Sequence, residues 1–331
     1  MKTLKPLFVL LALFFSTVQS QAANTLFKNG KSDYVIVLAP NASKSETTAA
    51  KELQQYLEQV SGATLPIAGI DEISAKVLKK SGKKGTKIYV GWSEELKKAI
   101  GANRPDYADE GFTITAKDKS IFIYGGGLRG TMYGVFTFLE DNFGIKWFTP
   151  ECTVVPQMSE WSFSDFEDSQ SPALEYRFVQ YWNAVRSAPW LAHNKDNAVW
   201  GAADNEYGGL SAYWNAHTFG QFIPSGKYFE EHPEYFIVRN GERIPYGQLC
   251  LTNPDVLKLC TEGVMNAIEK NPLYWVYSVS QNDNMFPCEC EHCKAMEEKY
   301  GGHSGLLIWF VNQVADAVKT VYPDKYIGTF A

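Results

Sequence analysis

The spacing of apolar positions changes near the middle of the chain and divides it into two parts. In the first part, an apolar stripe on one face predicts a helix over residues 45–61, which Gly62 ends. Residues 112–115 and 120–124 alternate around three polar positions and predict a hairpin. With the apolar runs between them, these elements predict a compact mixed α/β domain over residues 24–150.

In the second part, strands and helices are predicted to alternate. Residues 151–171 are rich in Ser, Asp, Glu and Pro, which predicts a linker. The strands expected beyond it are residues 174–181, 212–218, 275–280 and 326–331. Helices are expected to begin near Asn253 and Ser304, and Asn240-Gly241 predicts a tight hairpin turn. This order favours a parallel sheet or a (β/α) barrel. The expected fold class is therefore α/β, an N-terminal mixed α/β sandwich domain followed by an incomplete TIM-like barrel over residues 172–331.

The first residues have the layout of a secretory signal. Lys2 and Lys5 precede an apolar run over residues 7–15, and Ser20-Gln21-Ala22 offers small residues at the two positions that signal peptidase recognises. The run is too short to cross a bilayer, which needs about 20 apolar residues. We expect a cleaved signal peptide over residues 1–22, a periplasmic or secreted mature protein and no membrane span.

Composition narrows the class of partner. The net charge is −6 and no block of basic residues is present, which argues against a nucleic-acid partner. The chain is rich in aromatic residues, with 9 Trp, 18 Tyr and 20 Phe, and aromatic faces are the surfaces on which sugar rings stack.

A glycine motif raises the question of a cofactor. Residues 125–130, Gly-Gly-Gly-Leu-Arg-Gly, follow an expected strand, open an expected helix and match the spacing of a dinucleotide-binding turn. The strand belongs to a hairpin, however, and Glu140 and Asp141 lie at a helix end where a strand tip should carry the ribose ligand. Close packing of helix on sheet explains the glycines better, and no cofactor is expected.

Three of the six cysteines are clustered, in Cys288-x-Cys290-x-x-Cys293, with two histidines nearby. Three thiolates and one histidine can hold a structural zinc ion. An exported protein favours a disulfide, in which Cys293 would pair with one of the other two or with a distant cysteine. Both alternatives are structural, with the disulfide slightly preferred. Cys260 lies on an apolar helix stripe and is expected to be a core thiol.

Aromatic residues gather between residues 182 and 214, where Trp182, Trp190, Trp200 and Trp214 lie among polar residues and glycines. About half of them are expected to fill the core. The others suit a binding cleft formed by long loops, and Trp182 and Trp214 are the candidates for stacking on a sugar ring.

Polar residues at the ends of the expected strands are the candidates for chemistry. Asp283, with Asn282 before it, follows the strand over 275–280 and can bind hydroxyls, orient an amide, transfer a proton or simply brace a loop. Arg177 lies in the first expected barrel strand and needs a polar or anionic partner, whether structural or a glycan. His217 is a structural histidine or a hydrogen-bonding group for substrate.

Several segments resemble known families. Residues 44–68, 90–93, 109–112 and 125–150 resemble the α/β domain that precedes the catalytic barrel in β-N-acetylhexosaminidases and α-glucuronidases. Residues 171–293 resemble the domain-of-unknown-function 4838 family found in Bacteroidetes. The segments that carry this second resemblance are His232-Pro-Glu-Tyr-Phe236, Gln248-Leu-Cys-Leu-Thr-Asn-Pro254, Ser280-Gln-Asn-Asp283 and the cysteine cluster.

The resemblance implies a TIM-like barrel and, for some members, hydrolysis of N-glycans with the substrate acetamide as nucleophile. One carboxylate orients that acetamide and a neighbouring acid protonates the leaving oxygen, an exception to the usual two-carboxylate scheme. In related barrels both carboxylates follow the fourth strand, which here is the expected strand over 326–331. Asp283 is therefore placed in the sugar-binding wall, and it is also the one catalytic candidate. We expect the general acid beyond Ala331 and expect a truncated chain that can be inactive as it stands, because a full barrel takes about 250 residues.

These observations leave three hypotheses for function. The first is an exported glycoside hydrolase of N-acetylglucosamine-containing glycans, with Asp283 in a catalytic role and Arg177, Trp182, Trp214, His217 and Asn282 binding substrate. The second keeps the fold but replaces the reaction with α-glucuronidase-like hydrolysis of uronic-acid side chains, for which Arg177 and Arg186 are the nearby basic residues. The third is a glycan-binding protein without catalysis.

Overall fold

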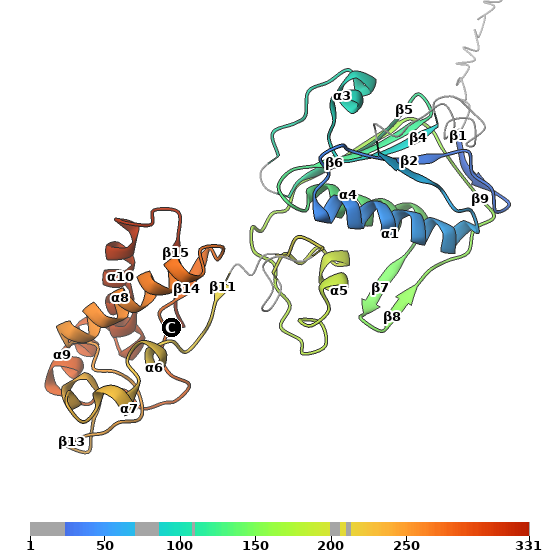
Figure 1. The fold of residues 1–331 in the computed structure, drawn as a ribbon. Coiled ribbons are helices and arrows are strands. Elements are labelled where there is room, and N and C mark those ends of the chain that lie inside the picture. The colour runs from blue at the N-terminus through green and yellow to red at the C-terminus, as the bar shows by residue number, and fades with distance from the viewer. Residues whose placement is uncertain (1–23, 70–85, 108–109, 199–205, 210–212, 331) are drawn as a thin grey trace, which may run out of the picture.

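The described residues fold into two lobes, each with its own main apolar core, and a smaller apolar cluster lies on the second face of the first lobe's sheet. The computed structural model describes residues 24–69, 86–107, 110–198, 206–209 and 213–330. The first core draws on residues from Leu26 to Tyr207, and the second on residues from Phe219 to Val318. Figure 1 shows the corresponding lobes, the first coloured from blue to yellow-green and the second from yellow to red. The predicted signal peptide lies outside the described residues. In the ranges just given, no helix combines the length and apolarity that a membrane crossing requires.

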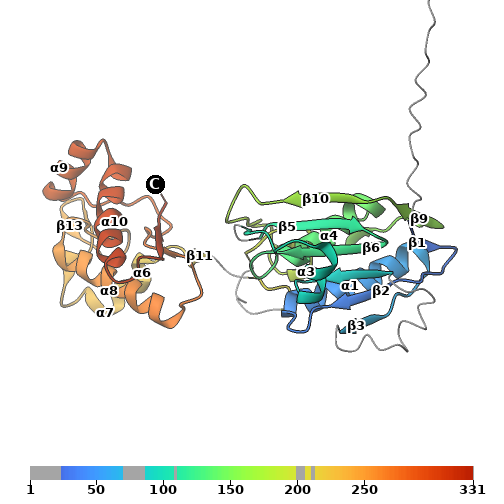
Figure 2. The same ribbon diagram turned by 90° about the horizontal axis from the view of Figure 1, so that it is seen from above.

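A six-stranded mixed sheet forms the centre of the first lobe. Its strands, in spatial order, are β10 (Phe166–Gln170), β5 (Phe112–Lys117), β6 (Ser120–Gly125), β4 (Lys87–Val90), β2 (Val35–Leu38) and β3 (Ile67–Gly69). The last four of these are mutually parallel, while β5 runs antiparallel to both of its neighbours. Figure 2 shows the strands side by side. The predicted hairpin over residues 112–124 is confirmed as β5 and β6.

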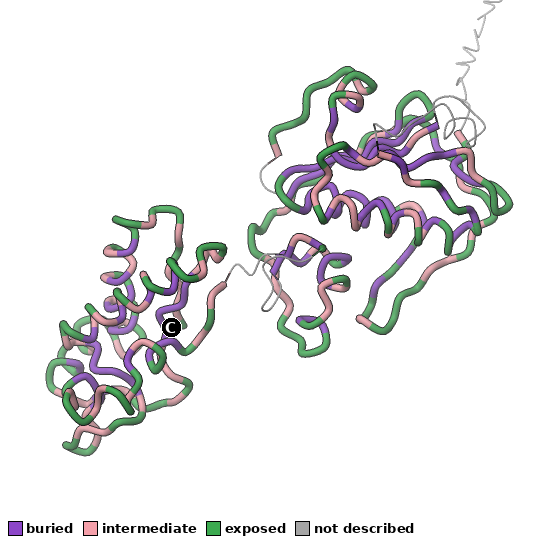
Figure 3. The backbone as a smooth tube through the Cα atoms, in the orientation of Figure 1, coloured by how far each residue is buried: buried purple, intermediate pink, exposed green. Residues whose placement is uncertain are grey.

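Helices cover both faces of this sheet. α1 (Lys44–Ser61) and α4 (Gly130–Phe143) pack on one face, and α3 (Glu94–Ile100) packs on the other. Successive strand residues point to opposite faces, so Ile36 joins the core under α1 and α4 while Val37 joins the cluster under α3. Figure 3 shows buried positions along α1 where it faces the sheet.

The first helix begins two residues before its expected cap. Ser43, not Ser45, is the N-cap of α1, and its hydroxyl accepts from the Glu46 backbone N–H while the Glu46 carboxylate accepts from the Ser43 N–H. The hydroxyl of Ser45 instead donates to the Leu128 carbonyl. Gly62 ends the helix with a φ of 75°, as predicted.

The predicted linker over residues 151–171 is wrong, because these residues are strands of the first lobe. β8 (Cys152–Val154) pairs with β7 (Lys146–Thr149), and β9 (Glu160–Phe163) pairs with β1 (Asn24–Lys28). β10 then forms an edge of the main sheet. Exposed edge strands carry polar residues on their open side, so their composition resembles that of a linker.

The predicted strand over residues 174–181 is also absent. The Arg177 backbone N–H donates to the Asn197 side chain, and the Asn197 backbone N–H donates back to the Arg177 carbonyl, so this backbone does not join a sheet. α5 (Ala188–His193) packs against α4 and β7, and His193 and Tyr207 both hydrogen-bond Glu52 of α1. The first lobe therefore extends well beyond residue 150, the boundary expected from the sequence.

The second lobe is built on a parallel three-stranded sheet. The strands lie in the order β11 (Tyr213–Trp214), β14 (Val276–Ser278) and β15 (Tyr326–Gly328). Long helices separate them along the chain: α8 (Pro254–Lys270) precedes β14, and α9 (Glu291–Tyr300) and α10 (His303–Lys319) precede β15. These (β/α) units confirm the predicted α/β class, and three strands of the expected barrel are described.

Short elements connect β11 to α8. They are α6 (Phe219–Phe222), α7 (Ser225–Tyr228), a 3₁₀ turn η2 (Pro233–Tyr235), β12 (Val238–Arg239) and β13 (Glu242–Arg243). The predicted turn at Asn240-Gly241 is confirmed, with φ values of 52° and 84°. Asn253 caps α8 as predicted, accepting from the backbone N–H groups of Asp255 and Val256.

Candidate functional site

The carboxyl ends of β11 and β14 bring His217, Asn282 and Asp283 into one region. Because the two strands are parallel and paired, the loops that follow them leave the same edge of the sheet, where α/β proteins bind ligands. The His217 backbone N–H donates to the Ser280 hydroxyl at 2.9 Å, and His217 Nδ1 lies 2.9 Å from the Gln281 carbonyl oxygen. These contacts hold the exposed imidazole beside the loop that carries Asp283.

Asn282 is the most tightly held of the three residues. Its Nδ2 donates to the Gly247 carbonyl at 2.7 Å, and its Oδ1 accepts from the Gly220 N–H at 2.9 Å. Its backbone exchanges two hydrogen bonds with the side chain of Gln248. Asn282 therefore braces three segments, and its amide is already satisfied by protein groups.

Asp283 is exposed next to this brace. Within the described ranges, no group hydrogen-bonds or ion-pairs with its carboxylate. Because the carboxylate oxygens can still accept hydrogen bonds and the loop that carries them is held in place, Asp283 is suited to bind hydroxyl or amide groups.

A cavity of about 450 Å³ adjoins the brace. It is lined by Gly220, Ile223, Pro224, Ser225, Gly226, Phe236, Pro245, Tyr246, Gly247, Leu249, Asn282 and Asn284. None of these residues is charged. Tyr246 is 64% exposed, so its ring is available to a ligand. Sequence analysis missed Tyr246 because a single tyrosine after a proline has no distinctive pattern.

The two predicted stacking tryptophans do not line this cavity. Trp214 is half-buried and stacks on Phe222 with ring centroids 6.2 Å apart, so it packs on the second core. Trp182 is 69% exposed, and the Arg186 guanidinium lies 3.5 Å from its ring centroid. Trp200 lies outside the described residues.

Arg177 belongs to a buried ionic network in the first lobe, apart from His217, Asn282 and Asp283. Its guanidinium and that of Arg129 both pair with the buried carboxylate of Glu110. Arg129 also donates to the carbonyls of Asn197 and Gly208, at 3.0 and 2.7 Å. The structure thus supplies the anionic partner that Arg177 needs, and that partner is a protein group.

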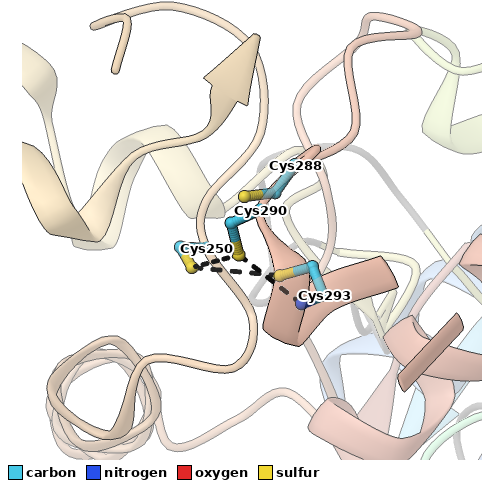
Figure 4. A group of neighbouring side chains, drawn as sticks. All are labelled: Cys250, Cys288, Cys290 and Cys293. Atoms are coloured by element: carbon cyan, nitrogen blue, oxygen red, sulfur yellow. Dashed lines mark hydrogen bonds between the residues drawn. The ribbon is translucent and has the colours of Figure 1, made fainter. Parts of the chain in front are cut away.

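Four cysteines converge in the second lobe. The sulfurs of Cys250, Cys288, Cys290 and Cys293 lie within 4.8 Å of one another, and Figure 4 shows them gathered between two segments. All four are free thiols in the structure, so the disulfide preferred from the sequence is not formed. Sequence analysis found three members and missed Cys250, which lies far away along the chain.

Hydrogen bonds within the cluster change the acidity of its thiols. The neighbouring Cys288 and Cys293 side chains, followed by Arg243, lower the pKa of Cys250. The two histidines near the motif are not members: His292 is exposed and His303 pairs with Glu297. Cys260 is a fully buried core residue as predicted, and burial raises the pKa of its thiol.

The first and last glycines of the motif, Gly125 and Gly130, serve packing, as the sequence indicated. A Cβ at Gly125 would lie 2.4 Å from the Gly130 carbonyl carbon, and one at Gly130 would meet the Gly111 carbonyl oxygen. The backbone of β6 and the start of α4 therefore approach too closely for any side chain.

The chain therefore has a two-lobed α/β architecture with polar loops at the carboxyl edge of a parallel sheet. Comparison with known families makes this specific. The chain matches the family described as "Domain of unknown function (DUF4838)" over residues 147–331, and it belongs to that family. Residues 13–138 match "Glycosyl hydrolase family 67 N-terminus".

Curated relatives are glycoside hydrolases. A probable alpha-glucuronidase A of Aspergillus fumigatus is 24% identical over 185 residues, which are 55% of this chain and 17% of that protein. Alpha-glucuronidase A of Emericella nidulans is 22% identical over 144 residues, 43% of this chain and 14% of that protein. The chain thus spans less than a fifth of the length of these relatives.

Solved structures of low sequence identity also align with the chain. A family GH115 4-O-methyl-alpha-glucuronidase with specificity for decorated arabinogalactans aligns with a TM-score of 0.49 and 14% identity, over 91% of this chain and 42% of that one. A GH20 beta-N-acetylhexosaminidase from Streptomyces coelicolor A3(2) aligns with a TM-score of 0.49 and 11% identity, over 93% and 63%.

Proposed function

We propose that this chain acts as part of an exported glycoside hydrolase and that it binds N-acetylglucosamine-containing glycans at the carboxyl edge of the second sheet. The observation that carries the proposal is the convergence of His217, Asn282 and Asp283 at one edge of the sheet, where Asn282 lines a cavity of about 450 Å³. The relationship to glycoside hydrolases supports a glycan as the ligand.

The chemistry of the cavity favours a neutral sugar. Its lining offers the Asn284 amide, the Ser225 hydroxyl and the exposed Tyr246 ring, while Asn282 holds the cavity wall in place. Amides and hydroxyls exchange hydrogen bonds with sugar hydroxyls and an acetamide, and an aromatic face packs on ring C–H groups. In this proposal Asp283 accepts from an acetamide N–H, the orienting role that substrate-assisted hydrolysis needs. We assign the general acid to no described residue.

A second candidate is hydrolysis of uronic-acid side chains, favoured by the match to the family 67 N-terminus and to α-glucuronidases. Recognition of a uronate calls for a cation, best an arginine. The two arginines considered from the sequence are engaged elsewhere, Arg177 with Glu110 and Arg186 over Trp182. For this reason the neutral sugar is the first choice.

The export part of the proposal rests on the pattern of residues 1–22. Expression of the full chain in a Gram-negative host, followed by N-terminal sequencing of the periplasmic fraction, tests it. A mature N-terminus at residue 23 supports export, and a cytoplasmic chain that retains Met1 contradicts it.

Calorimetric titration of the full chain with chitobiose and with a glucuronic-acid-substituted xylo-oligosaccharide tests the ligand. We expect chitobiose to bind and Asp283→Asn to weaken binding about tenfold or more, which corresponds to about 1.4 kcal/mol. Asp118→Asn is the matched control, since Asp118 lies in the β5–β6 turn with a φ of 49°, which asparagine also tolerates. Unchanged binding by Asp283→Asn, or preferential binding of the acidic sugar, would overturn the assignment.

Release of free sugar in the same mixtures separates catalysis from binding. Liberated N-acetylglucosamine supports the hydrolase, liberated glucuronic acid supports the second candidate, and tight binding without product leaves a glycan-binding protein.

A further inference from the structure

The four-cysteine cluster joins two segments that are distant in sequence. Cys250 lies just before α8, and the other three cysteines lie at the start of α9, where Cys290 is the N-cap. Three of the four side chains are buried and Cys290 is half-buried. Neither the glycan proposal nor the family match assigns a role to this cluster.

Sulfur–sulfur distances discriminate between a metal and a disulfide. A tetrahedral zinc ion with Zn–S bonds of about 2.3 Å places its ligand sulfurs about 3.8 Å apart. The sulfur of Cys250 lies 3.8 Å from that of Cys290 and 3.9 Å from that of Cys293. A disulfide requires about 2.05 Å. These two distances match ligands around one ion and are too long for a covalent pair, and all four sulfurs lie within 4.8 Å of one another.

Donors from the surrounding chain point at the sulfurs, as around metal-bound thiolates. The Val238 N–H donates to Cys288 Sγ at 3.4 Å, and the Cys293 N–H donates to Cys290 Sγ at 3.5 Å. The Thr252 hydroxyl lies 3.3 Å from Cys293 Sγ. Such outer contacts orient ligands and offset their negative charge.

We propose that Cys250, Cys288, Cys290 and Cys293 bind one zinc ion in a closed, structural site. Four thiols lose their protons to solvent as one Zn²⁺ binds, which leaves a centre with net charge −2. Arg243 of β13, a cationic neighbour of the Cys250 sulfur, offsets part of that charge. All four tetrahedral positions are taken by protein sulfurs, so the ion has no open position for a substrate.

The zinc site acts on the loop that carries the candidate glycan residues. The zinc site joins the segment before α8 to the segment that leads into α9. Gln248 joins the same two segments through its hydrogen bonds to Asn282 and Asn284. Zinc at one end of the loop and the Gln248 side chain at the other fix residues 282–293 against the segment before α8. The ion therefore positions Asp283 without touching a ligand.

Elemental analysis by plasma mass spectrometry of the full chain, purified without chelators, is the direct test. We expect about one zinc per chain and, after denaturation without reductant, six titratable thiols. Replacement of zinc by Co²⁺ should give the thiolate charge-transfer and visible d–d absorption of a tetrahedral CoS₄ centre. Cys250→Ser should lose the zinc, whereas Cys152→Ser, which removes an exposed thiol outside the cluster, should retain it.

Two outcomes would overturn the proposal, and neither depends on a variant that folds. An intact mass lower by about 4 Da than that of the reduced chain would show two disulfides in place of the metal. Six free thiols in a chain that takes up neither Zn²⁺ nor Co²⁺ in equilibrium dialysis would show a site without metal affinity. Both measurements are independent of glycan binding.

Discussion

The side chain of Gln248 and the backbone of Asn282 form a reciprocal pair of hydrogen bonds. Gln248 Nε2 donates to the Asn282 carbonyl at 2.8 Å, and Gln248 Oε1 accepts from the Asn282 N–H at 2.8 Å. Gln248 is only 2% exposed and satisfies a loop backbone that has no strand partner there. A glutamine thus takes the place of a neighbouring strand for the loop that carries Asp283.

Gln248→Ala should therefore destabilise the fold by about 1–3 kcal/mol, because the half-buried N–H and C=O of Asn282 would lose their partners. Urea denaturation followed by circular dichroism measures the loss. Gln313→Ala on α10 removes one 3.3 Å bond to a helix carbonyl and should change stability by less than about 0.5 kcal/mol. An equal loss of stability in the two variants would show that the hydrogen bonds of Gln248 contribute no more than the single helix contact of Gln313.

Glu110→Gln should lower the free energy of unfolding of the first lobe by about 3–5 kcal/mol. The substitution leaves the buried Arg129 and the half-buried Arg177 without their shared counter-ion. Glu160→Gln is the control, because Glu160 forms an exposed pair with Lys28, and such pairs contribute about 0–1 kcal/mol. A midpoint shift in guanidinium chloride no larger than that of the control would contradict the buried-network interpretation.

Gly247→Ala should destabilise the cavity wall. Gly247 has a φ of +106°, and a Cβ there would lie 2.5 Å from Ile237 Cδ1, so an alanine is both strained and crowded. Gly226 lines the same cavity, and a Cβ there meets no atom within 4 Å. We expect differential scanning calorimetry to show a lower Tm for Gly247→Ala, with Gly226→Ala close to the parent chain. A lower Tm for Gly226→Ala than for Gly247→Ala would contradict this explanation of the cavity wall.

Tyr246→Ala should weaken chitobiose binding about tenfold, or about 1.4 kcal/mol, while Tyr246→Phe should retain most of it because stacking needs the ring face. Tyr181→Ala removes a ring of comparable exposure away from the cavity and should have no effect on binding. Saturation-transfer NMR identifies the sugar protons that lie on the ring. If Tyr181→Ala weakens binding and Tyr246→Ala does not, the glycan lies elsewhere.

Much of the fold was predictable wherever one element has its own strong pattern. The helix α8 has a cap, a proline at its first position and an apolar stripe, and its predicted start at Asn253-Pro254 agrees with the structure. The hairpin β5–β6 follows directly from alternation around its turn. Such signals depend on neighbours along the chain, so a single sequence contains them.

Predictions failed where pairing depends on a distant partner. β9 and β10 are polar and short, and they are strands because β1 and β5 lie beside them. Residues 174–181 have the apolar content of a strand, but Asn197 takes the backbone hydrogen bonds of Arg177 and no sheet forms there. In both cases the deciding hydrogen bonds come from residues that local pattern does not include.

The sequence by itself determined the α/β class, the main helices and the packing glycines, because apolar periodicity and backbone sterics act over a few residues. It also placed Asn282 and Asp283 at a strand end. Only the tertiary structure decided that Cys250 joins Cys288, Cys290 and Cys293, that Arg177 pairs with Glu110, and that Gln248 braces Asn282. Those contacts link positions far apart in sequence, and their geometry exists only once both cores have packed.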